Sequence, residues 1–368
     1  MSRDSFLTVA EVAEELKVSE STVRRAIRSD RLQVYRVGNS GMIRVSREQL
    51  QAYLEGGEPS SNGNGVAPPQ IDQGSQPNIV QEERPTVFSG ETRQGHEWKV
   101  IHADVVQGLR QLEAGSVNCI TTSPPYYWQR DYEVDGQLGH EASVDEYVAA
   151  LQLTFREARR VLADDGVLFL NIGDSYYNAK GKPHGRDRKH RARQLSRRVL
   201  RAVDGPGLGY PRKSLLGIPW RVALALQQDG WVLRSSIVWQ RPAPMPEPTA
   251  HDRPWRTHEP VFLFSKKPRY WFNRDALNGD EDIWRISARP YNPGSHFAPF
   301  PLELADRCVR AGSPSGGTVL DPFVGSGTTM LMALARGMSA VGIDLKREYC
   351  EFVRDQITNH DDLPLLSD

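Results

Sequence analysis

The stretch Ser-Val-Asn-Cys-Ile-Thr-Thr-Ser-Pro-Pro-Tyr-Tyr, residues 116–127, contains a strand signal followed by a rigid loop. Residues 116–120 form a short apolar run without helical periodicity, which is typical of a buried parallel strand. The two prolines fix φ twice and leave the preceding carbonyls without a local amide donor. In open α/β sheets ligands bind at the carboxyl ends of strands, so chemistry is expected in the loop at 121–127. Taken alone, Ser-Pro-Pro is equally consistent with an ordinary surface turn.

The composition is that of an ordinary globular protein without an overall charge bias. The chain has 368 residues, of which 39% are hydrophobic and 25% are charged. That length predicts one large domain together with a smaller one. Lys plus Arg and Asp plus Glu both total 46, so only local clusters of charge can indicate a charged partner.

Cysteine usage and hydropathy indicate the cellular compartment that is expected for the protein. Cys119, Cys308 and Cys350 are scattered along the chain, which excludes a disulfide framework and a cysteine-rich zinc site, and no metal is expected. No apolar run reaches the ~20 residues that span a bilayer, and the N-terminus lacks a signal-peptide pattern. We therefore expect a cytoplasmic protein that makes no contact with a membrane.

Residues 1–56 are predicted to form a DNA-binding domain of their own. A capping-box pattern at residues 8–11 opens a first helix, and Ser19 is placed to cap a second helix over residues 20–28. Two short helices with a tight turn, the second rich in Arg and small polar residues, are typical of a helix-turn-helix. The residues that the second helix would present to DNA are Ser21, Thr22, Arg24, Arg25 and Arg28.

The rest of that domain carries a hairpin signal. Residues 32–37 and 42–45 alternate in polarity around Gly-Asn-Ser-Gly, a pattern that predicts a β-hairpin. Ser46 would cap a last helix that ends at Leu54. The stretch resembles the winged helix-turn-helix of excisionase and MerR-like proteins. A small helical domain that contacts another protein is the alternative interpretation.

Residues 57–95 separate this domain from the remainder of the chain. They are dominated by Gly, Pro, Ser, Asn and Gln, and they show almost no apolar periodicity. Such a composition predicts a flexible linker.

Residues 96–368 show short apolar runs that alternate with amphipathic helices. This alternation predicts an α/β domain, a doubly wound, Rossmann-like and mostly parallel sheet with helices on both faces. The predicted strands lie at residues 98–102, 117–121, 167–172, 233–239, 261–264, 318–320 and 340–343. The predicted helices lie at residues 144–162, 218–228, 301–311, 328–336 and 348–357.

A second motif lies near the C-terminus, where the strand at 318–320 runs into Asp-Pro-Phe-Val-Gly-Ser-Gly-Thr-Thr, residues 321–329. A Gly-rich turn between a strand and a helix lets a ligand approach the backbone, and free amides at the helix start favour an anionic group. Asp344 ends the next strand, where an acid can bind a ribose diol. The motif is neither a Walker A loop nor Gly-x-Gly-x-x-Gly, so the bound nucleoside need not carry phosphates.

Together the two motifs resemble the β-class of S-adenosylmethionine-dependent DNA amino-methyltransferases. In that class the Thr-Ser-Pro-Pro-Tyr loop precedes the Gly-rich loop, as it does here, which is a circularly permuted motif order; other classes have the reverse order. The resemblance covers about residues 98–357. Ala243 and Pro248 depart from it, because the family usually carries Asn-Pro-Met-Pro-Glu-Ser there. Further segments that resemble the family lie at residues 102–104, 239–259 and 296–301.

The resemblance implies transfer of a methyl group from S-adenosylmethionine to an exocyclic amine in double-stranded DNA. The Ser123 hydroxyl and the Pro124 carbonyl would accept the two N–H groups of that amine and favour a more tetrahedral, more nucleophilic nitrogen. Pro125 belongs to the same loop, and Tyr126 would stack on a base that has been flipped out of the duplex. The implied cofactor-binding residues are Asp104, His296, Phe297, Pro299, Asp321, Phe323, Gly325, Ser326, Gly327, Thr328 and Asp344.

The target base stays open between cytosine and adenine. A C5-cytosine mechanism needs a cysteine nucleophile, whereas Cys119 lies inside a predicted strand and all three cysteines are expected to be buried. Methylation of an amine is therefore preferred. Within the family, Ser at the first position of the loop leans toward the N4 amine of cytosine, and Asp or Asn toward the N6 amine of adenine. Ser123 thus favours cytosine N4, with adenine N6 as the alternative.

A strongly basic insertion is predicted at residues 178–214. It contains twelve Lys or Arg residues against Asp187 and Asp204, a local charge of +10 in a chain without net charge. Such a segment suits contacts with DNA phosphates, although a merely solvated loop is the alternative. We expect it to share target recognition with the N-terminal domain. Its candidate DNA-binding residues are Arg186, Arg188, Lys189, Arg191, Arg193, Arg197 and Arg198.

Two other classes of function compete with a site-specific DNA methyltransferase of a restriction–modification or protective modification system. A catalytically inactive DNA-binding regulator would have lost reactive motifs, but all of them are present in the sequence. A methyltransferase that acts on RNA or on protein amides typically carries Asn-Pro-Pro-Tyr and the reverse motif order. The sequence leaves open whether a cognate restriction endonuclease is a partner and whether the protein is a monomer or a homodimer.

Overall fold

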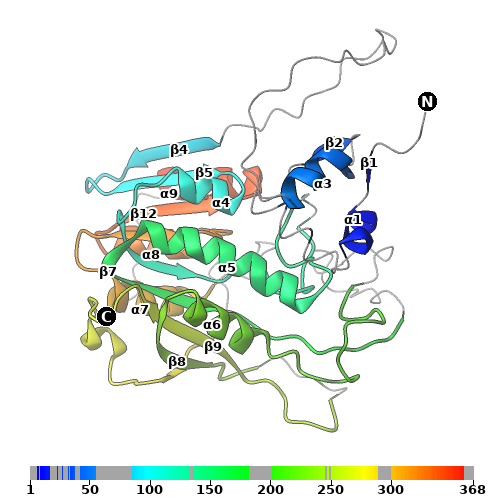
Figure 1. Cartoon of the computed structure of the whole chain (residues 1–368). Coiled ribbons are helices and arrows are strands. Elements are labelled where there is room, and N and C mark those ends of the chain that lie inside the picture. Colours follow the sequence, from blue (N-terminus) through cyan, green and yellow to red (C-terminus); the bar gives the residue numbers. More distant parts are fainter. Residues whose placement is uncertain are drawn as a thin grey trace, which may run out of the picture. The chain divides into compact units, whose positions relative to one another are not determined.

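The chain divides into two compact units, Met1–Ile79 and Val80–Asp368, which are considered separately. Figure 1 shows the computed structural model. It describes residues 6–7, 9–16, 23, 27, 32, 34–37, 42–54, 85–132, 134, 136–181, 201–244, 247, 250–288 and 300–359.

The first unit combines a small antiparallel sheet with helices. Strands β1 (Phe6–Leu7), β3 (Met42–Ser46) and β2 (Tyr35–Val37) lie in this order, with α1 (Val9–Glu15) and α3 (Arg47–Leu54) beside them. Both β1 and β2 pair antiparallel with β3. The first helix, the hairpin and the last helix are therefore where the sequence predicted them.

The core of the first unit is small and is closed by a capping box. Val12, Leu32 and Val45 are almost fully buried in one apolar cluster. The Ser46 hydroxyl accepts a hydrogen bond from Gln49 N at 3.2 Å, and the Gln49 side chain accepts one from Ser46 N at 3.0 Å. This reciprocal pair satisfies amides that a helix start leaves free. Of the second predicted helix only residues 23 and 27 are described, so Ser21, Thr22, Arg24, Arg25 and Arg28 lie outside the described residues.

The second unit contains a nine-stranded mixed sheet. Its order is β10-β8-β9-β7-β6-β11-β12-β5-β4. The five central strands β7, β6, β11, β12 and β5 are parallel, whereas β9 runs antiparallel to both β7 and β8, and β4 runs antiparallel to β5. The strands are β4 (Thr86–Glu91), β5 (Glu97–His102), β6 (Val117–Thr122), β7 (Leu162–Asn171), β8 (Val232–Gln240), β9 (His258–Ser265), β10 (Ile283–Arg285), β11 (Thr318–Asp321) and β12 (Ser339–Asp344).

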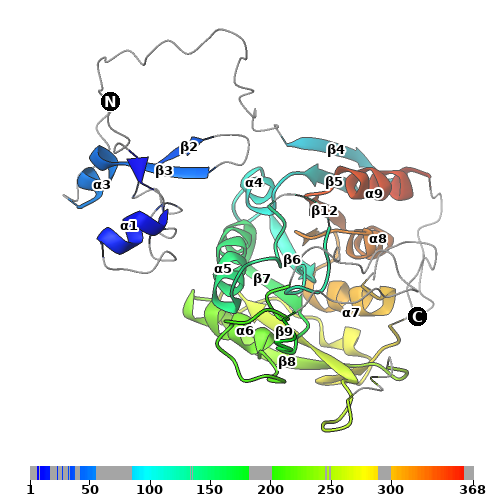
Figure 2. The same ribbon diagram turned by 90° about the vertical axis from the view of Figure 1, so that its right-hand side faces the viewer.

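Among the described residues, three helices cover each face of this sheet (Figure 2). On α5 (Val144–Val161), buried Leu151, Phe155 and Ala158 recur at helical spacing and pack on one face of the sheet. This spacing puts the apolar side chains on one side of the helix and leaves the other side to solvent. No helix in the described part of the chain is long and apolar enough to cross a bilayer. One face carries α4 (Val105–Arg110), α5 (Val144–Val161) and α6 (Ile218–Gln228), and the other carries α7 (Leu302–Gly312), α8 (Thr328–Ala335) and α9 (Arg347–Asn359).

The predicted doubly wound α/β fold is confirmed, with one correction at the linker. All seven predicted strands and all five predicted helices of this unit are present, and α6 has the predicted bounds. Strand β4, however, lies inside the segment predicted to be a linker. This edge strand is paired on one side only and is mostly exposed, so its composition resembles that of a linker. Residues 57–84 of that segment lie outside the described residues.

The connections make β6 and β11 the switch point of the sheet. Strand β6 leads through α5 to β7 on one side, while neighbouring β11 leads through α8 to β12 on the other side and over the opposite face. In doubly wound sheets ligands bind at such a switch point, beyond the carboxyl ends of the strands. The loops after β6 and β11 are the two motifs singled out in the sequence.

The caps of α3 and α5 allow a test of the division into two units. Ser46→Ala should lower the stability of the first unit by about 1 kcal/mol, because it removes an N-cap acceptor. The matched variant is Ser143→Ala, since the Ser143 hydroxyl caps α5 through Glu146 N at 3.2 Å. Hydrogen exchange on the full chain should show faster exchange in α3 for the first variant and in α5 for the second. Faster exchange in both helices from either variant would contradict two separate units.

Candidate active site at the switch point of the sheet

The loop after β6 is held rigidly from two sides. The Tyr147 hydroxyl of α5 donates to the Pro125 carbonyl at 2.6 Å. Trp128 N donates to the Gly139 carbonyl at 2.7 Å, and Trp128 adopts a positive φ of 52°. A left-handed backbone at a bulky residue is strained and is maintained only by such surrounding contacts. These contacts therefore stabilise the observed conformation of the loop.

Tyr126 is fixed at both its ring and its hydroxyl. A Cβ atom added to Gly173 would lie 2.5 Å from Tyr126 Cε2, so the ring lies directly against that glycine. The Tyr126 hydroxyl reaches Asn171 Oδ1 at 3.0 Å and Glu259 Oε2 at 2.8 Å. Burial and the neighbouring Glu259 charge raise the pKa of Tyr126 well above its usual value, so the side chain stays a neutral donor.

Ser123 completes a hydrogen-bond chain within the loop. Its hydroxyl donates to the Tyr126 hydroxyl oxygen at 3.3 Å, and Tyr126 donates onward to Asn171 or Glu259. Because Ser123 acts as a donor here, its own lone pairs stay available. No donor in the described part of the chain reaches the Pro124 carbonyl. The two acceptors predicted for an amine therefore lie next to each other in the chain, and no described residue donates a hydrogen bond to either of them.

Asp321 joins this loop to the Gly-rich loop. Its carboxylate accepts hydrogen bonds from Thr122 Oγ1 at 2.6 Å, from Thr329 Oγ1 at 2.9 Å and from Phe323 N at 3.1 Å. Burial raises the pKa of Asp321 to about 6. The prediction placed Asp321 on the cofactor, whereas all of these bonds are internal. Asp321 thus connects the end of β6 with the start of α8.

Asp344 fixes the other end of the Gly-rich loop. Its carboxylate accepts hydrogen bonds from Gly325 N at 3.0 Å and from Lys346 N at 2.8 Å. Burial raises the pKa of Asp344 to about 6, in spite of these bonds. Each carboxylate oxygen has a second lone pair, so Asp344 can still accept hydrogen bonds from a ligand.

The Gly-rich loop and its neighbours fit a nucleoside-containing cofactor. A Cβ at Gly325 would meet nothing closer than 3.9 Å, so the backbone is open to a ligand there, whereas a Cβ at Gly327 would lie 2.9 Å from Val353. Helix α8 begins at Gly327 without a side-chain cap, and its free amides suit a carboxylate. The hydroxyl groups of Ser326 and Thr328 lie 3.2 Å apart beside these amides.

Two further predicted cofactor positions can be compared with the structure. Asp104 is exposed and caps α4, accepting from Val106 N and Gln107 N with a single oxygen, Oδ1. Its other oxygen remains for a ligand, and the adjacent Ala103 N donates to the Asp344 carbonyl at 3.0 Å. Asp104, which follows β5, and Asp344, which ends β12, therefore lie near each other at the carboxyl ends of these two neighbouring strands. The predicted residues His296, Phe297 and Pro299 lie outside the described residues.

The sequence assigned no role to three polar residues of this site: Asn171, Asp174 and Glu259. Asp174 accepts hydrogen bonds from Gly217 N at 3.0 Å and Ile218 N at 3.1 Å, and so holds the start of α6. Burial raises the pKa of Asp174. The signal that could have identified Asn171 and Asp174 is their position directly after a parallel strand. The family resemblance at residues 239–259 included Glu259 but gave it no role, because its contact with Tyr126 is non-local.

The predicted basic insertion is described only at its ends. Arg186, Arg188, Lys189, Arg191, Arg193, Arg197 and Arg198 lie outside the described residues. At its C-terminal end, Lys213 is 74% exposed and pairs with Asp252 at 2.5 Å. This end therefore lies beside the segment between β8 and β9.

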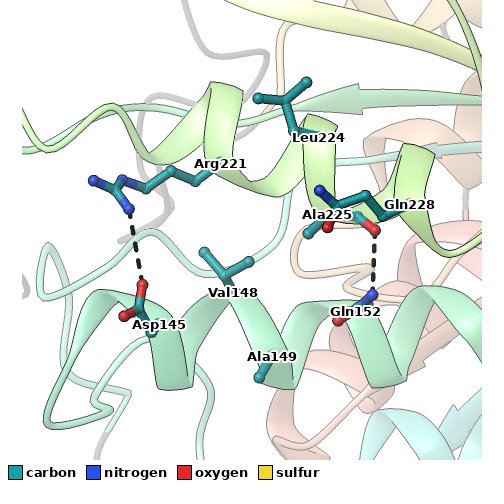
Figure 3. A pocket seen from close by; sticks show the side chains of 8 residues that line it. All are labelled: Asp145, Val148, Ala149, Gln152, Arg221, Leu224, Ala225 and Gln228. Atoms are coloured by element: carbon teal, nitrogen blue, oxygen red, sulfur yellow. Dashed lines mark hydrogen bonds and ion pairs between the residues drawn. The ribbon is translucent and has the colours of Figure 1, made fainter.

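A surface groove between α5 and α6 is separate from these motifs (Figure 3). Its volume is about 290 Å³, and it is crossed by a hydrogen bond from Gln152 to the Ala225 carbonyl at 3.2 Å. None of the predicted site residues that the structure describes lines it. Its lining residues are Asp145, Val148, Ala149, Gln152, Arg221, Leu224, Ala225 and Gln228.

The cysteines lie in the core, as predicted. Cys119, Cys308 and Cys350 are free and fully buried. Burial raises the pKa of the Cys119 thiol to about 12. A thiolate nucleophile is therefore not formed at any of these positions near neutral pH.

Comparison with known proteins places these features in a family. Residues 117–355 match the DNA methylase family, and residues 6–58 match a helix-turn-helix domain family. The chain is 41% identical over 271 residues to the Type II methyltransferase M.Cfr9I of Citrobacter freundii, covering 71% of this chain and 88% of that protein. It is 40% identical over 270 residues to the Type II methyltransferase M.SmaI of Serratia marcescens, covering 70% of this chain and 90% of that protein.

A solved structure shares the fold. The PvuII DNA methyltransferase, described as cytosine-N4-specific, matches with a TM-score of 0.54. The match covers 74% of this chain and 94% of that chain at 19% sequence identity. At this identity the likeness concerns the fold alone.

The bond between Thr122 and Asp321 provides a test of how the two loops are joined. Thr122→Val should lower the free energy of unfolding by about 1–3 kcal/mol, because it removes a donor from a buried carboxylate. Thr154→Val is the matched control, since Thr154 is equally buried but bonds only to the Ala150 carbonyl of its own helix. Urea unfolding measures both values. An equal or smaller loss for Thr122→Val would contradict the connecting role of Asp321.

Proposed function

The chain belongs to the DNA methylase family and uses S-adenosyl-L-methionine, and we propose that its target is the exocyclic N4 amine of cytosine in double-stranded DNA. The observation that carries this proposal is the hydrogen-bond chain from Ser123 through Tyr126 to Glu259, at the carboxyl edge beside the Gly-rich loop. Bound S-adenosyl-L-methionine supplies a methyl group made electrophilic by its sulfonium centre. The remaining work falls to residues of the protein.

The loop after β6 would hold the amine and orient its nitrogen. The Ser123 hydroxyl oxygen and the Pro124 carbonyl would each accept one N–H group, which reduces conjugation of the nitrogen lone pair with the ring. Pro125, anchored by Tyr147, keeps these acceptors in place. Tyr126 would stack on the flipped base, with its ring angle set by Gly173 and Glu259. Holding the amine in line with the methyl group accounts for most of the remaining acceleration.

Residues around the Gly-rich loop would hold the cofactor. Asp344 would accept the ribose hydroxyl groups, and the second oxygen of Asp104 would accept from the adenine amine. The amides at the start of α8 would bind the carboxylate of the amino-acid moiety. Asp321 would act through Thr122 and Thr329 rather than by contact with the cofactor. Phe323, Gly325, Ser326, Gly327 and Thr328, together with His296, Phe297 and Pro299, would line the remainder of this site.

The preference for cytosine rests on Ser123. A short neutral hydroxyl can donate to a ring nitrogen as well as accept from an amine, whereas family members with Asp or Asn in this position lean toward adenine. Adenine N6 is the second candidate. We further propose that the basic insertion and the helix-turn-helix contribute DNA contacts, as expected for a Type II modification enzyme that recognises a specific sequence.

The nature of the modified base gives the first test. DNA from cells that express the protein should contain N4-methylcytosine at one recurring sequence, detected by nucleoside mass spectrometry and single-molecule sequencing.

Ser123→Ala and Tyr126→Ala should each lower the methylation rate by about a hundredfold or more, because the amine loses its orientation, while calorimetry shows unchanged cofactor affinity. Ser116→Ala, at the opposite end of β6, is the control. N6-methyladenine instead would overturn the choice of base.

The raised pKa of Asp344 predicts a pH dependence of cofactor affinity. Hydrogen bonds from the ribose would favour the ionised carboxylate, so the pKa of Asp344 should be lower in the complex than its value of about 6 in the free protein. Affinity should therefore rise with pH up to about 6 and stay level above it. Calorimetry at several pH values between about 5 and 8, which lie on both sides of this pKa, measures the cofactor affinity at each pH. Asp344→Asn should bind more weakly and without this dependence; a level profile for the unaltered protein would remove Asp344 from the ribose.

A further inference from the structure

The segment between β8 and β9 leaves the sheet at the same edge as the proposed active site. Gln240 at the end of β8 pairs with His258 at the start of β9. Since β9 runs antiparallel to both β7 and β8, the carboxyl end of β8 points the same way as that of β7, which ends at Asn171. Figure 1 shows this connection projecting beyond the ends of β8 and β9. We name the described residues of 241–258 the β8–β9 segment.

The β8–β9 segment is bonded directly to the site residues. Arg256 Nη1 donates to the Asp174 carbonyl at 2.7 Å. Arg241 donates to Glu259 Oε1 at 3.2 Å and to the Arg256 carbonyl at 3.2 Å, and Glu259 in turn accepts from Tyr126. Trp255, which precedes Arg256, therefore belongs to a segment that is bonded to Asp174 and to Glu259, the partner of Tyr126.

The cations of this segment are fixed in place before any ligand binds. Glu247 accepts hydrogen bonds from Arg253 Nη1 at 2.8 Å, from Arg256 N at 3.0 Å and from Arg256 Nε at 3.3 Å. Burial opposes ionisation of Glu247, but the bonds from Arg253 and Arg256 lower its pKa to about 2. The guanidinium groups of Arg253 and Arg256 also lie over the Tyr176 ring, at 4.1 Å and 5.4 Å from its centroid.

The surface of the segment combines positive charge with one exposed aromatic side chain. Trp255 is 45% exposed, and its Nε1 donates to the Ala250 carbonyl at 3.3 Å, which fixes the ring to the segment itself. With residues 210–214 included, five Lys or Arg residues stand against Glu247 and Asp252, a net charge of +3 in a chain without net charge. A polyanion with stackable rings matches both properties.

We infer that the β8–β9 segment receives the DNA duplex and that Trp255 stacks into the gap left by the flipped target base. This inference rests on the proposed function, because it needs a base to leave the duplex for the Tyr126 pocket. Extruding a base costs unpairing and unstacking energy, and inserted apolar side chains offset it in proteins that open a duplex. Trp255 is exposed in a segment that is bonded to the site residues, and Arg253 and Arg256 in the same segment would supply the positive charge that meets the flanking phosphates.

The test compares two DNA duplexes that carry the sequence methylated by the unaltered protein. In the first the target base is paired, and in the second it faces an abasic position, so that no pairing has to be broken. On the paired duplex Trp255→Ala should lower kcat/KM about ten- to a hundredfold, in keeping with the energy of stacking one base. On the abasic duplex it should stay within about twofold of the unaltered protein, because the cost of unpairing has been removed. Trp255→Phe should give an intermediate loss on the paired duplex.

Matched controls separate this role from a loss of folding. Trp220→Ala removes a tryptophan that is 52% exposed but lies on α6 against Phe262, and it should show no difference between the two duplexes. Unchanged cofactor affinity by calorimetry shows that Trp255→Ala is folded. Full activity of Trp255→Ala on the paired duplex, or an equal loss on both duplexes, would overturn the inference. Absence of any methylation by the unaltered protein would instead overturn the proposed function and, with it, this inference.

Discussion

A buried carboxylate that bonds to both sides of the switch point holds the proposed active site together. Asp321 ends β11 and accepts hydrogen bonds from Thr122 at the end of β6 and from Thr329 in the first turn of α8. These contacts set the loop that would hold the amine against the loop that would hold the cofactor. Burial raises the pKa of Asp321 to about 6, because an ionised carboxylate loses its hydration inside the protein. The position of the Asp321 carboxylate therefore depends on these two hydroxyl groups and on its third donor, Phe323 N.

The substrate side of the site depends on a second network, centred on Tyr126. Its hydroxyl lies between Asn171 of β7 and Glu259 of β9, and its ring lies against Gly173. Glu259 is itself paired with Arg241, at the start of the β8–β9 segment. The orientation of one aromatic ring in the pocket is thus coupled to the surface that we infer to receive DNA. Such coupling would give the proposed base-binding site a defined geometry before a base binds, which is what catalysis by orientation requires.

Much of the fold could be predicted, because its signals are local. Short apolar runs and helical spacing predicted the strands and helices of the second unit, and α6 matched residue for residue. Strand β4 escaped prediction because an exposed edge strand buries little and has a polar composition. Likewise, the loops after β6 and β11 were predicted as sites, since a Ser-Pro-Pro turn and a Gly-rich turn after apolar strands are local patterns.

The sequence by itself determined the element types and the order of the two motifs, and it predicted the roles of Ser123, Tyr126 and Asp344, which stay predictions. The tertiary structure decided which side chains meet. Thr122 and Asp321 lie 199 positions apart, and Tyr126 and Glu259 lie 133 positions apart. Their contacts exist because β6 neighbours β11 and because β9 inserts antiparallel between β7 and β8. Strand order arises from packing of the whole sheet and leaves no local mark on the residues that it brings together.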